Sequence, residues 1–441
     1  MKRFYFATAF FLFLVLTVTG QLRRPNVVLI MADDLGYETL GCDGGLSYDT
    51  PTLDSLASIG IRYTECFSQP LGSPSRVKIM TGKYNFRNYE DFGYLNPKER
   101  SFGTLMKDAG YITCIAGKWQ LNGLARNNPG NQDVKRPYSF GFDEYCLWQL
   151  NHPEKDGGRY ANPLITVNGK DLRRDDDSYG PDIFCRFILD FIDKYSSQPF
   201  FVYYPMVLVH EPFVPTPDSP GWKRKSLRNK NDTAFFKDMV AYTDDIVHRI
   251  VMKLKDDGVW NNTILIFTAD NGTNRMVITK TIFGKVQGGK GMSLNSGNHV
   301  PLITSWPAMD KRARVYKGLI SFADFFPTLA EIAGVAKYQF KNDGVSFMNI
   351  LTGADAANQD EIFIHYSPGW GNLTQNRWVM DGKYKLYLDG RFFNTSTDPL
   401  ETRPLLRLSP EERDKKDRFN RILTEKGQEF PFSKNNPSLK P

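Results

Sequence analysis

Two adjacent carboxylates, Asp33 and Asp34, follow the apolar run NVVLIM at residues 26–31. A continuous apolar run is typical of a strand that is buried on both faces. Open α/β sheets bind their ligands at the carboxyl ends of such strands. Two neighbouring negative charges are costly there unless a cation or an arginine neutralises them. The pair indicates a cation site, and the alternative is a solvated turn in which aspartate caps a helix.

A second apolar run, TILIFT at residues 263–268, also ends in oxygen-bearing side chains, those of Asp270 and Asn271. Alone, the tripeptide Asp-Asn-Gly is a common turn. Together with Asp33 and Asp34 it supplies carboxylate and amide oxygens, which are the ligands that Ca²⁺ and Mg²⁺ prefer. The sequence therefore predicts one hard metal ion held by these four residues.

A Pro-Ser-Arg tripeptide at residues 74–76 begins a predicted helix within QPLGSPSRVKIMTGKY. Proline suits the first turn of a helix, where a missing N–H is tolerated. The free N–H groups and positive dipole end attract anions, and the Arg76 guanidinium matches an oxyanion. A plain helix start is the alternative when this stretch is taken alone. The predicted buried side of the helix consists of Val77, Ile79 and Met80.

Three further side chains suit anion binding or proton transfer. Lys118 follows a predicted strand and can hold an anion, although a surface lysine with a buried stem is the alternative. His210 also follows a predicted strand and is placed for catalysis, with a packed loop histidine as the alternative. Lys290 lies in the glycine-rich turn GGKG, where the backbone can approach a ligand. It can stabilise an oxyanion or protonate a leaving group.

Alternating buried strands and amphipathic helices must position these residues. The pattern predicts an α/β fold, a doubly wound and mostly parallel sheet flanked by helices. The predicted strands cover residues 26–31, 61–67, 111–116, 200–208, 263–268 and 301–306. The predicted helices begin near residues 51, 74, 102, 182, 235 and 322. Residues 124–180 are expected to be long loops over the site, with His152 and Arg159 as candidates for substrate contact or as ordinary loop residues.

The chain is expected to have two domains after a leader. Residues 1–20 have a basic start and an apolar stretch, which predicts a secretory signal peptide and a periplasmic or secreted protein without a stable membrane anchor. Residues 21–355 form the large domain. Residues 356–441 form a small α+β domain, with short strands in an antiparallel sheet, hairpin turns at Asp-Gly pairs and a helix at residues 410–426.

Composition limits the other functional classes. The net charge of +7 comes from 56 basic and 49 acidic residues without a basic block, so nucleic-acid binding is not expected. The five cysteines are too few for a disulfide scaffold and lack zinc-site spacing. The charge is compatible with an anionic substrate.

The segments PNVVLIMADDLGY, TPTLDSLASIGIRYTECFSQPLGSPSRVKIMTGKY and AGYITCIAGKWQL resemble the formylglycine-dependent sulfatases of the alkaline phosphatase superfamily. The resemblance continues in order along the chain. It implies calcium rather than magnesium as the metal, with Asp33, Asp34, Asp270 and Asn271 as ligands. It also implies that a set of cationic or polar residues contacts the formylglycine or the sulfate. That set is Arg76, Lys118, His210 and Lys290, with Gln120 and His299 as substrate-binding candidates.

This sequence departs from the family pattern at the position of the nucleophile. The family element is Cys or Ser, any residue, Pro, Ser or Ala, and Arg, and its first position falls on Gly72. Glycine has no side chain to oxidise, so a formylglycine-generating enzyme is not expected to act on it. Gln120 stands where many relatives have histidine, and it can donate a hydrogen bond but cannot transfer a proton.

Two functions follow from the resemblance. The first is a sulfuric ester hydrolase with calcium that acts on sulfated carbohydrates. The second is a pseudo-sulfatase that binds sulfated glycans, because Gly72 replaces the precursor of the nucleophile.

Overall fold

A ten-stranded sheet forms the centre of the computed structural model, which describes residues 24–309, 312–335, 341–354 and 359–431. Most neighbouring strands are parallel, whereas β11, β5 and β6 run antiparallel to their partners. The spatial order is β12 (Arg314–Ser321), β2 (Ile61–Phe67), β11 (Leu302–Ser305), β8 (Thr263–Ala269), β1 (Asn26–Ala32), β7 (Phe200–Pro205), β3 (Ile112–Lys118), β4 (Glu144–Trp148), β5 (Ile165–Val167) and β6 (Lys170–Asp171).

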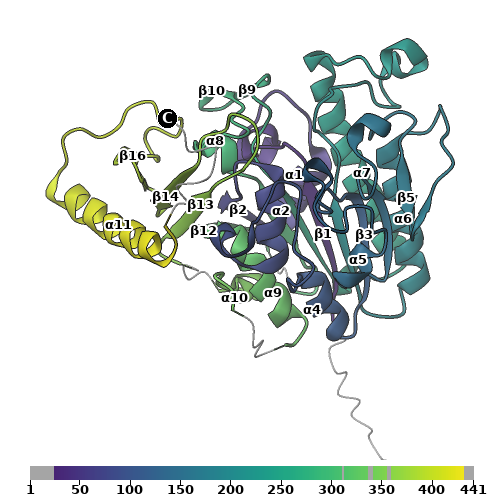
Figure 1. Ribbon diagram of the computed structural model, residues 1–441, viewed down its shortest axis with the longest axis horizontal. Helices are drawn as coiled ribbons and strands as arrows, with labels where there is room; N and C mark the ends of the chain where they lie inside the picture. The colour runs from purple at the N-terminus through teal and green to yellow at the C-terminus, as the bar shows by residue number, and fades with distance from the viewer. Residues whose placement is uncertain (1–23, 310–311, 336–340, 355–358, 432–441) are drawn as a thin grey trace, which may run out of the picture.

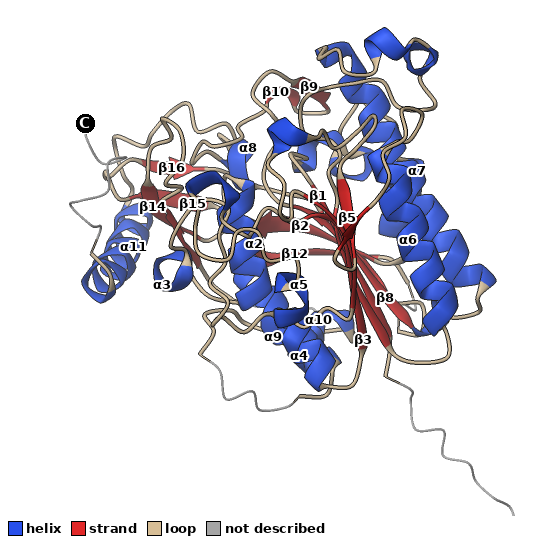
Figure 2. Ribbon diagram, turned by 45° about the vertical axis from the view of Figure 1, so that its right-hand side comes forward, coloured by secondary structure: helices blue, strands red, loops and turns tan. Residues whose placement is uncertain are grey.

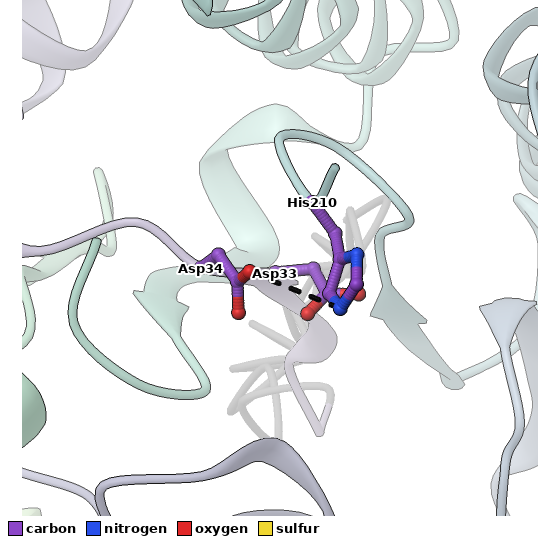
Figure 3. A group of neighbouring side chains, drawn as sticks. All are labelled: Asp33, Asp34 and His210. Atoms are coloured by element: carbon purple, nitrogen blue, oxygen red, sulfur yellow. Dashed lines mark ion pairs between the residues drawn. The ribbon is translucent and has the colours of Figure 1, made fainter. Parts of the chain in front are cut away.

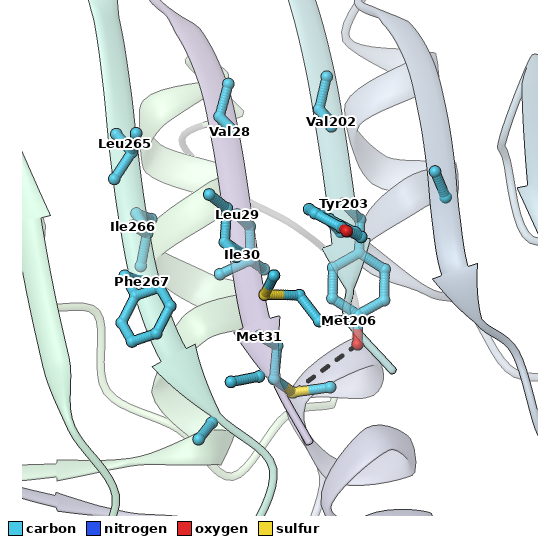
Figure 4. Close-up of a cluster of buried hydrophobic side chains, with 14 of the residues drawn as sticks. Val28, Leu29, Ile30, Met31, Val202, Tyr203, Met206, Leu265, Ile266 and Phe267 are labelled. Carbon is cyan, nitrogen blue, oxygen red and sulfur yellow. Dashed lines mark hydrogen bonds between the residues drawn. The ribbon is translucent and has the colours of Figure 1, made fainter. Parts of the chain in front are cut away.

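The core is centred on β1, which lies between β8 and β7 and is parallel to both. Every residue of β1 is buried, because helices cover both faces of the sheet. Figure 4 shows side chains of the three strands packed together, including Leu29, Ile266 and Val202. The apolar runs therefore form the central strands, as the sequence predicts.

Two layers of helices enclose this sheet (Figure 2). One layer contains α1 (Pro51–Ile59), α6 (Gly180–Tyr195) and α7 (Phe236–Asp256). The other contains α2 (Gly72–Thr81), α4 (Phe102–Asp108) and α9 (Phe325–Ile332). This arrangement confirms the predicted doubly wound α/β fold. The short helices are α3 (Asn85–Asn88), α5 (Arg136–Ser139), α8 (Asn295–Asn298) and α10 (Met348–Leu351).

A small antiparallel sheet lies beside the large one and packs against the C-terminal helix (Figure 1). Its hairpins turn at Gly382 and Gly390, which both have positive φ angles, as the Asp-Gly pairs predict. Lys385 of this sheet is fully buried, pairs with Glu401 at 2.9 Å and donates to the carbonyl oxygen of Ser293 at 2.8 Å. The elements are β13 (Ile362–Tyr366), β14 (Asn376–Met380), β15 (Tyr384–Tyr387), β16 (Phe392–Asn394) and α11 (Pro410–Glu429).

The structure differs from the predictions in several places. Residues 124–180 are not only loops, because they contain β4, β5 and β6, which extend the large sheet. Helix α2 is buried along its whole length rather than on one side, since α3, α4 and α9 contact it. A hairpin of β9 (Ile278–Thr281) and β10 (Gly284–Gln287) was not predicted.

Some predictions fall where the structure gives no description. The signal peptide at residues 1–20 lies outside the described residues, as does the predicted domain boundary at 355–356. Within the described residues, no helix combines the length and apolarity that crossing a membrane requires.

Candidate active site and metal centre

The carboxyl ends of β1, β7 and β8 bring the predicted ligands together. Asp33 exchanges backbone hydrogen bonds of 2.7 Å with the segment after β7, donating to Leu208 and accepting from Val209. The Asp34 amide donates to Oδ1 of Asp270 at 3.1 Å. Asp34 has a positive φ of 65°, which turns the chain at the strand end. Figure 3 shows Asp33 and Asp34 beside His210. These contacts fix three carboxylates at one edge of the sheet.

Each of these carboxylates has its own cationic partner. Lys118 Nζ lies 2.7 Å from Oδ2 of Asp33, at the end of β3. Lys290 Nζ lies 2.7 Å from Oδ2 of Asp34. On α2, the Arg76 guanidinium lies 2.8 Å from Oδ2 of Asp270. The three carboxylates are almost fully buried, so their charges require this compensation.

Arg159 adds a fourth cation, which the sequence placed only as a candidate for substrate contact. Its guanidinium lies 3.8 Å from Oδ2 of Asp33 and stacks over the Trp148 ring, with 4.2 Å to the centroid. The side chain is 2% exposed, and its Nε and NH1 atoms have no hydrogen-bond partner among the described residues. His152, the other candidate from this segment, pairs instead with Asp171 at 2.8 Å.

The geometry around His210 defines its protonation. Nδ1 lies 2.5 Å from the carbonyl oxygen of Glu211, which can only accept, so Nδ1 carries the proton. Nε2 then accepts a hydrogen bond from Lys290 Nζ at 2.8 Å. Burial, followed by the positive charges of Lys290 and Arg159, lowers the pKa of His210 well below its usual value. The ring is therefore neutral and presents a lone pair beside a lysine.

The acidic residues fit a hard divalent cation. One ligand atom each from Asp33, Asp34 and His210 lies within 4.8 Å of the others. Asn271 is fully buried and its Oδ1 has no hydrogen-bond partner among the described residues, while its Nδ2 donates to Oδ1 of Asp34 at 2.9 Å. A half-turn of this amide would direct its oxygen to the carboxylates. Members of the sulfatase family generally bind a divalent metal, and this donor set is consistent with one.

Asp33 and Asp270 differ in the acidity of their carboxyl groups. Burial raises the pKa of a carboxyl, but at Asp33 the charges of Lys118, Arg76 and Lys290 outweigh it and hold the pKa well below the usual range. At Asp270, burial and then the charge of Asp33 raise the pKa, and Arg76 opposes them. Asp33 is therefore the more acidic of these two carboxyls.

A pocket of about 470 Å³ opens over these residues, a size that suits a small organic ligand. Gln120, with a positive φ of 52°, lines it as the sequence predicts for a substrate contact. The predicted site residues that line it are Asp33, Asp34, Gly72, Lys118, Gln120, His210, Asn271 and Lys290. The structure therefore brings most of the predicted site together around one pocket.

Gly72 faces the centre of this arrangement. A Cβ atom on residue 72 would lie 2.5 Å from Oδ2 of Asp270 and 3.6 Å from Nε of Arg76. That Nε atom is buried and has no hydrogen-bond partner among the described residues. A side chain on residue 72 would thus start against the Asp270–Arg76 pair, and the Asp270 carboxylate would have to shift to admit it.

His299 lies apart from the pocket lining. Its ring stacks between Tyr37 and Phe67, with centroid distances of 4.1 and 4.8 Å, and Nε2 lies 2.8 Å from the carbonyl oxygen of Thr64. Burial lowers the pKa of His299 to about 4. This packing gives no support to the predicted substrate contact.

Sequence motifs do not single out several of the pocket residues. The lining includes Phe92, Gln149, Glu154, Lys155 and Trp370. Gln149, Glu154 and Lys155 fall within residues 124–180, which were expected to lie over the site, whereas Trp370 lies in the loop between β13 and β14. Trp370 lies in the short sequence PGWGN, which predicts only a turn.

The fold is a doubly wound α/β fold, and its carboxyl edge gathers buried carboxylates and cationic side chains beside one pocket. The sulfatase family profile matches residues 25–335. The chain therefore belongs to the sulfatase family.

Curated relatives agree with this assignment. The chain is 27% identical to human arylsulfatase A over 414 residues, which cover 86% of this chain and 78% of the human protein. It is 30% identical to mouse N-acetylgalactosamine-6-sulfatase over 366 residues, which cover 74% of this chain and 66% of the mouse protein. Family membership and these relatives support sulfuric ester hydrolase activity.

Solved structures share the fold. One was determined in complex with its substrate D-glucosamine-2-N,6-O-disulfate, and it matches with a TM-score of 0.75 at 21% identity, covering 95% of this chain and all of the other. Another, Ps i-CgsB in complex with k-i-k-neocarrahexaose, matches with a TM-score of 0.74 at 22% identity, covering 92% of this chain and 94% of the other.

Proposed function

We propose that this chain acts on sulfate esters of carbohydrates in the pocket at the carboxyl edge of the large sheet. The observation that carries the proposal is the convergence of Arg76, Lys118, His210 and Lys290 with three buried carboxylates. Positive groups fixed in a buried site stabilise the charge that develops on sulfate oxygens and on the leaving group. The relatives named for sulfated amino sugars support a carbohydrate as the alcohol part.

We propose calcium as the metal, held by Asp33, Asp34, Asp270 and Asn271. When bound, the ion polarises sulfate oxygens as a Lewis acid. The charges of the chain support this assignment. Three carboxylates face Arg76, Lys118 and Lys290, so a divalent cation on the carboxylates leaves the three cations free to bind an anion. Oxygen ligands alone favour calcium or magnesium, and the sulfatase likeness favours calcium.

We further propose that Gly72 occupies the formylglycine position of the family. The support is its position, because a Cβ on residue 72 would point at the Asp270–Arg76 pair, with a shift of the Asp270 carboxylate needed to admit it. Hydrolysis by this chain then lacks a side-chain nucleophile, and water must attack the sulfur instead. The same observation favours a second candidate function, the binding of sulfated glycans without hydrolysis.

A comparison of Gly72→Cys with the native chain tests both candidates. Each protein is expressed with a formylglycine-generating enzyme and assayed with calcium for sulfate release from 4-nitrophenyl sulfate and N-acetylgalactosamine 6-sulfate. Gly72→Ala is the matched control, because it adds the same Cβ without an oxidisable group. We expect far more turnover from Gly72→Cys than from the native chain or Gly72→Ala, with saccharide binding in all three proteins.

Other results separate the possibilities. Equal turnover by the native chain and Gly72→Cys would show that residue 72 is not the nucleophile position. Native turnover far below that of Gly72→Cys but above that of a Lys290→Met variant would identify water-driven hydrolysis. An absence of both turnover and sulfate-ester binding in every variant would refute the proposed function.

We propose a periplasmic or secreted location, supported by the basic and apolar sequence of residues 1–20. The N-terminal sequence of the mature protein tests it. A start near residue 21 supports the proposal, whereas an intact Met1 in a cell-associated protein contradicts it.

A further inference from the structure

Trp370 is a large aromatic side chain that is exposed at the pocket. It is 40% exposed, although one face of the ring stacks on Phe92 with 4.1 Å between centroids and 15° between planes. Both residues line the pocket that contains the candidate sulfate site. An exposed aromatic face beside a charged pocket offers apolar contact to a ligand that has both apolar and polar faces.

The loop that carries Trp370 is held in place by hydrogen bonds to the large domain. Tyr89 donates its hydroxyl to the carbonyl oxygen of Pro368 at 2.8 Å. Arg126 donates to the carbonyl oxygen of Gly369 at 2.9 Å, and its guanidinium lies 5.8 Å from the centroid of the Trp370 ring. The ring is therefore positioned before a ligand binds, which lowers the entropic cost of binding.

The aromatic pair is also tied to the anion site. Phe92 precedes Gly93, whose amide donates to Oγ of Ser73 at 2.6 Å. Ser73 follows Gly72 at the start of α2, in the helix that carries Arg76. The Trp370 ring and the start of α2 therefore line the same pocket, so one ligand can contact both.

Glu154 provides a second polar group at the pocket, and its carboxylate is held in place by Arg159. Glu154 lines the pocket with a side chain that is 47% exposed, and it accepts a hydrogen bond from the buried guanidinium of Arg159. Arg159 in turn stacks on Trp148 and approaches Asp33. Carboxylate oxygens only accept hydrogen bonds, so Glu154 presents an acceptor to hydroxyl donors.

We propose that Trp370, backed by Phe92, is the platform on which a pyranose ring of the substrate packs, and that Glu154 accepts hydrogen bonds from the hydroxyl groups of that ring. The inference rests on the proposed function, because it names the residues that recognise the carbohydrate part of a sulfate ester. The apolar C–H face of the sugar packs on the indole, while its hydroxyl groups face the fixed carboxylate. Arg159 and Phe92 are positioning residues.

Binding measurements on the native chain test the proposal without requiring turnover. Isothermal titration with calcium present uses inorganic sulfate, which reports on the anion site alone, and N-acetylgalactosamine 6-sulfate, which reports on both parts. We expect Trp370→Ala to weaken saccharide binding about tenfold and to change sulfate binding less than twofold. Trp370→Phe should recover most of the loss. Glu154→Gln should weaken saccharide binding at least threefold, with sulfate binding unchanged.

Trp260→Ala is the matched control. Trp260 lies in the turn before β8, at the opposite end of that strand from Asp270, and its removal should alter neither affinity. Thermal melts confirm that each variant is folded. Unchanged saccharide binding in Trp370→Ala, with sulfate and saccharide both bound by the native chain, would overturn the platform while leaving the proposed function intact. If the native chain binds neither probe, the proposed function fails and the platform fails with it.

Discussion

Replacing Glu38 with glutamine should remove one component of the pH dependence of stability. Glu38 follows the Asp33-Asp34 turn, is fully buried, and accepts a hydrogen bond of 2.5 Å from Oγ1 of Thr273. Oγ1 of Thr273 accepts from the Gly36 amide at 2.9 Å, so this contact joins the loops after β1 and β8. Oε2 of Glu38 has no hydrogen-bond partner among the described residues. Burial raises the pKa of Glu38 from 4.5 to about 7.

The sign and size of the effect follow from this shift. The folded state binds the proton more tightly than the unfolded state, so the contribution to stability is complete below pH 4.5 and is lost as the pH rises through 7. A shift of this size corresponds to about 3 kcal/mol between pH 4.5 and pH 8. Glutamine has the shape of the protonated side chain and does not titrate. Glu38→Gln should therefore match the native stability near pH 4.5 and exceed it by about 3 kcal/mol at pH 8.

Urea unfolding of both proteins at pH 4.5, 6, 7 and 8 measures this difference. The comparison cancels other groups that titrate in the same range. Glu331→Gln is the control for the chemical change, because Glu331 lies exposed on α9. If the free-energy difference between native protein and Glu38→Gln stays constant from pH 4.5 to pH 8, Glu38 is not held neutral by burial and the reasoning is wrong.

Two further predictions concern buried charge. Lys385→Met should lower the free energy of unfolding by about 3–5 kcal/mol, because it leaves Glu401 buried without its cation. The double variant with Glu401→Gln should recover part of this loss. Equal urea midpoints for the native protein and Lys385→Met would contradict the prediction. Calcium at 100 times its Kd should stabilise the fold by about 2.7 kcal/mol, and a chelator should reverse the rise in Tm. Asp270→Asn should reduce that rise, whereas an identical calcium response in both proteins would exclude Asp270 as a ligand.

The central strands of the main sheet and the acidic residues of the site could be predicted because short stretches of the sequence indicate them. A strand buried on both faces has a continuous apolar sequence, and a carboxylate directly after it indicates the edge of the sheet at which ligands bind. Asp33, Asp34, Asp270 and Asn271 were found in this way and lie together in the structure. The helix start predicted near residue 102 is likewise confirmed, because Ser101 forms a capping box with Thr104 at the start of α4.

Other features depend on contacts between distant segments. Strand β12 contains Lys317 and Gly318 at an irregularity in its pairing with β2, which breaks the apolar pattern. Strand β4 has only five residues within a polar region, where periodicity carries little information. His299 was assigned by its place in a motif, but the aromatic rings on both sides of it determine its environment. The position of Trp370 depends on its stacking with Phe92, which no local pattern records.

The loop after the first strand of the small C-terminal sheet contributes to the pocket, whereas the charged groups of the site come from the large domain. Tyr366 on β13 donates its hydroxyl to the carbonyl oxygen of Gly291, next to Lys290, while the loop after β13 carries Trp370. The large domain supplies the charged groups, whose positions are constrained by one another. The loop at residues 367–375 is not part of this set of mutually paired charged groups. If the proposed function holds, natural variation or library selection in that loop changes which glycan is accepted, while the groups proposed to bind the sulfate remain the same.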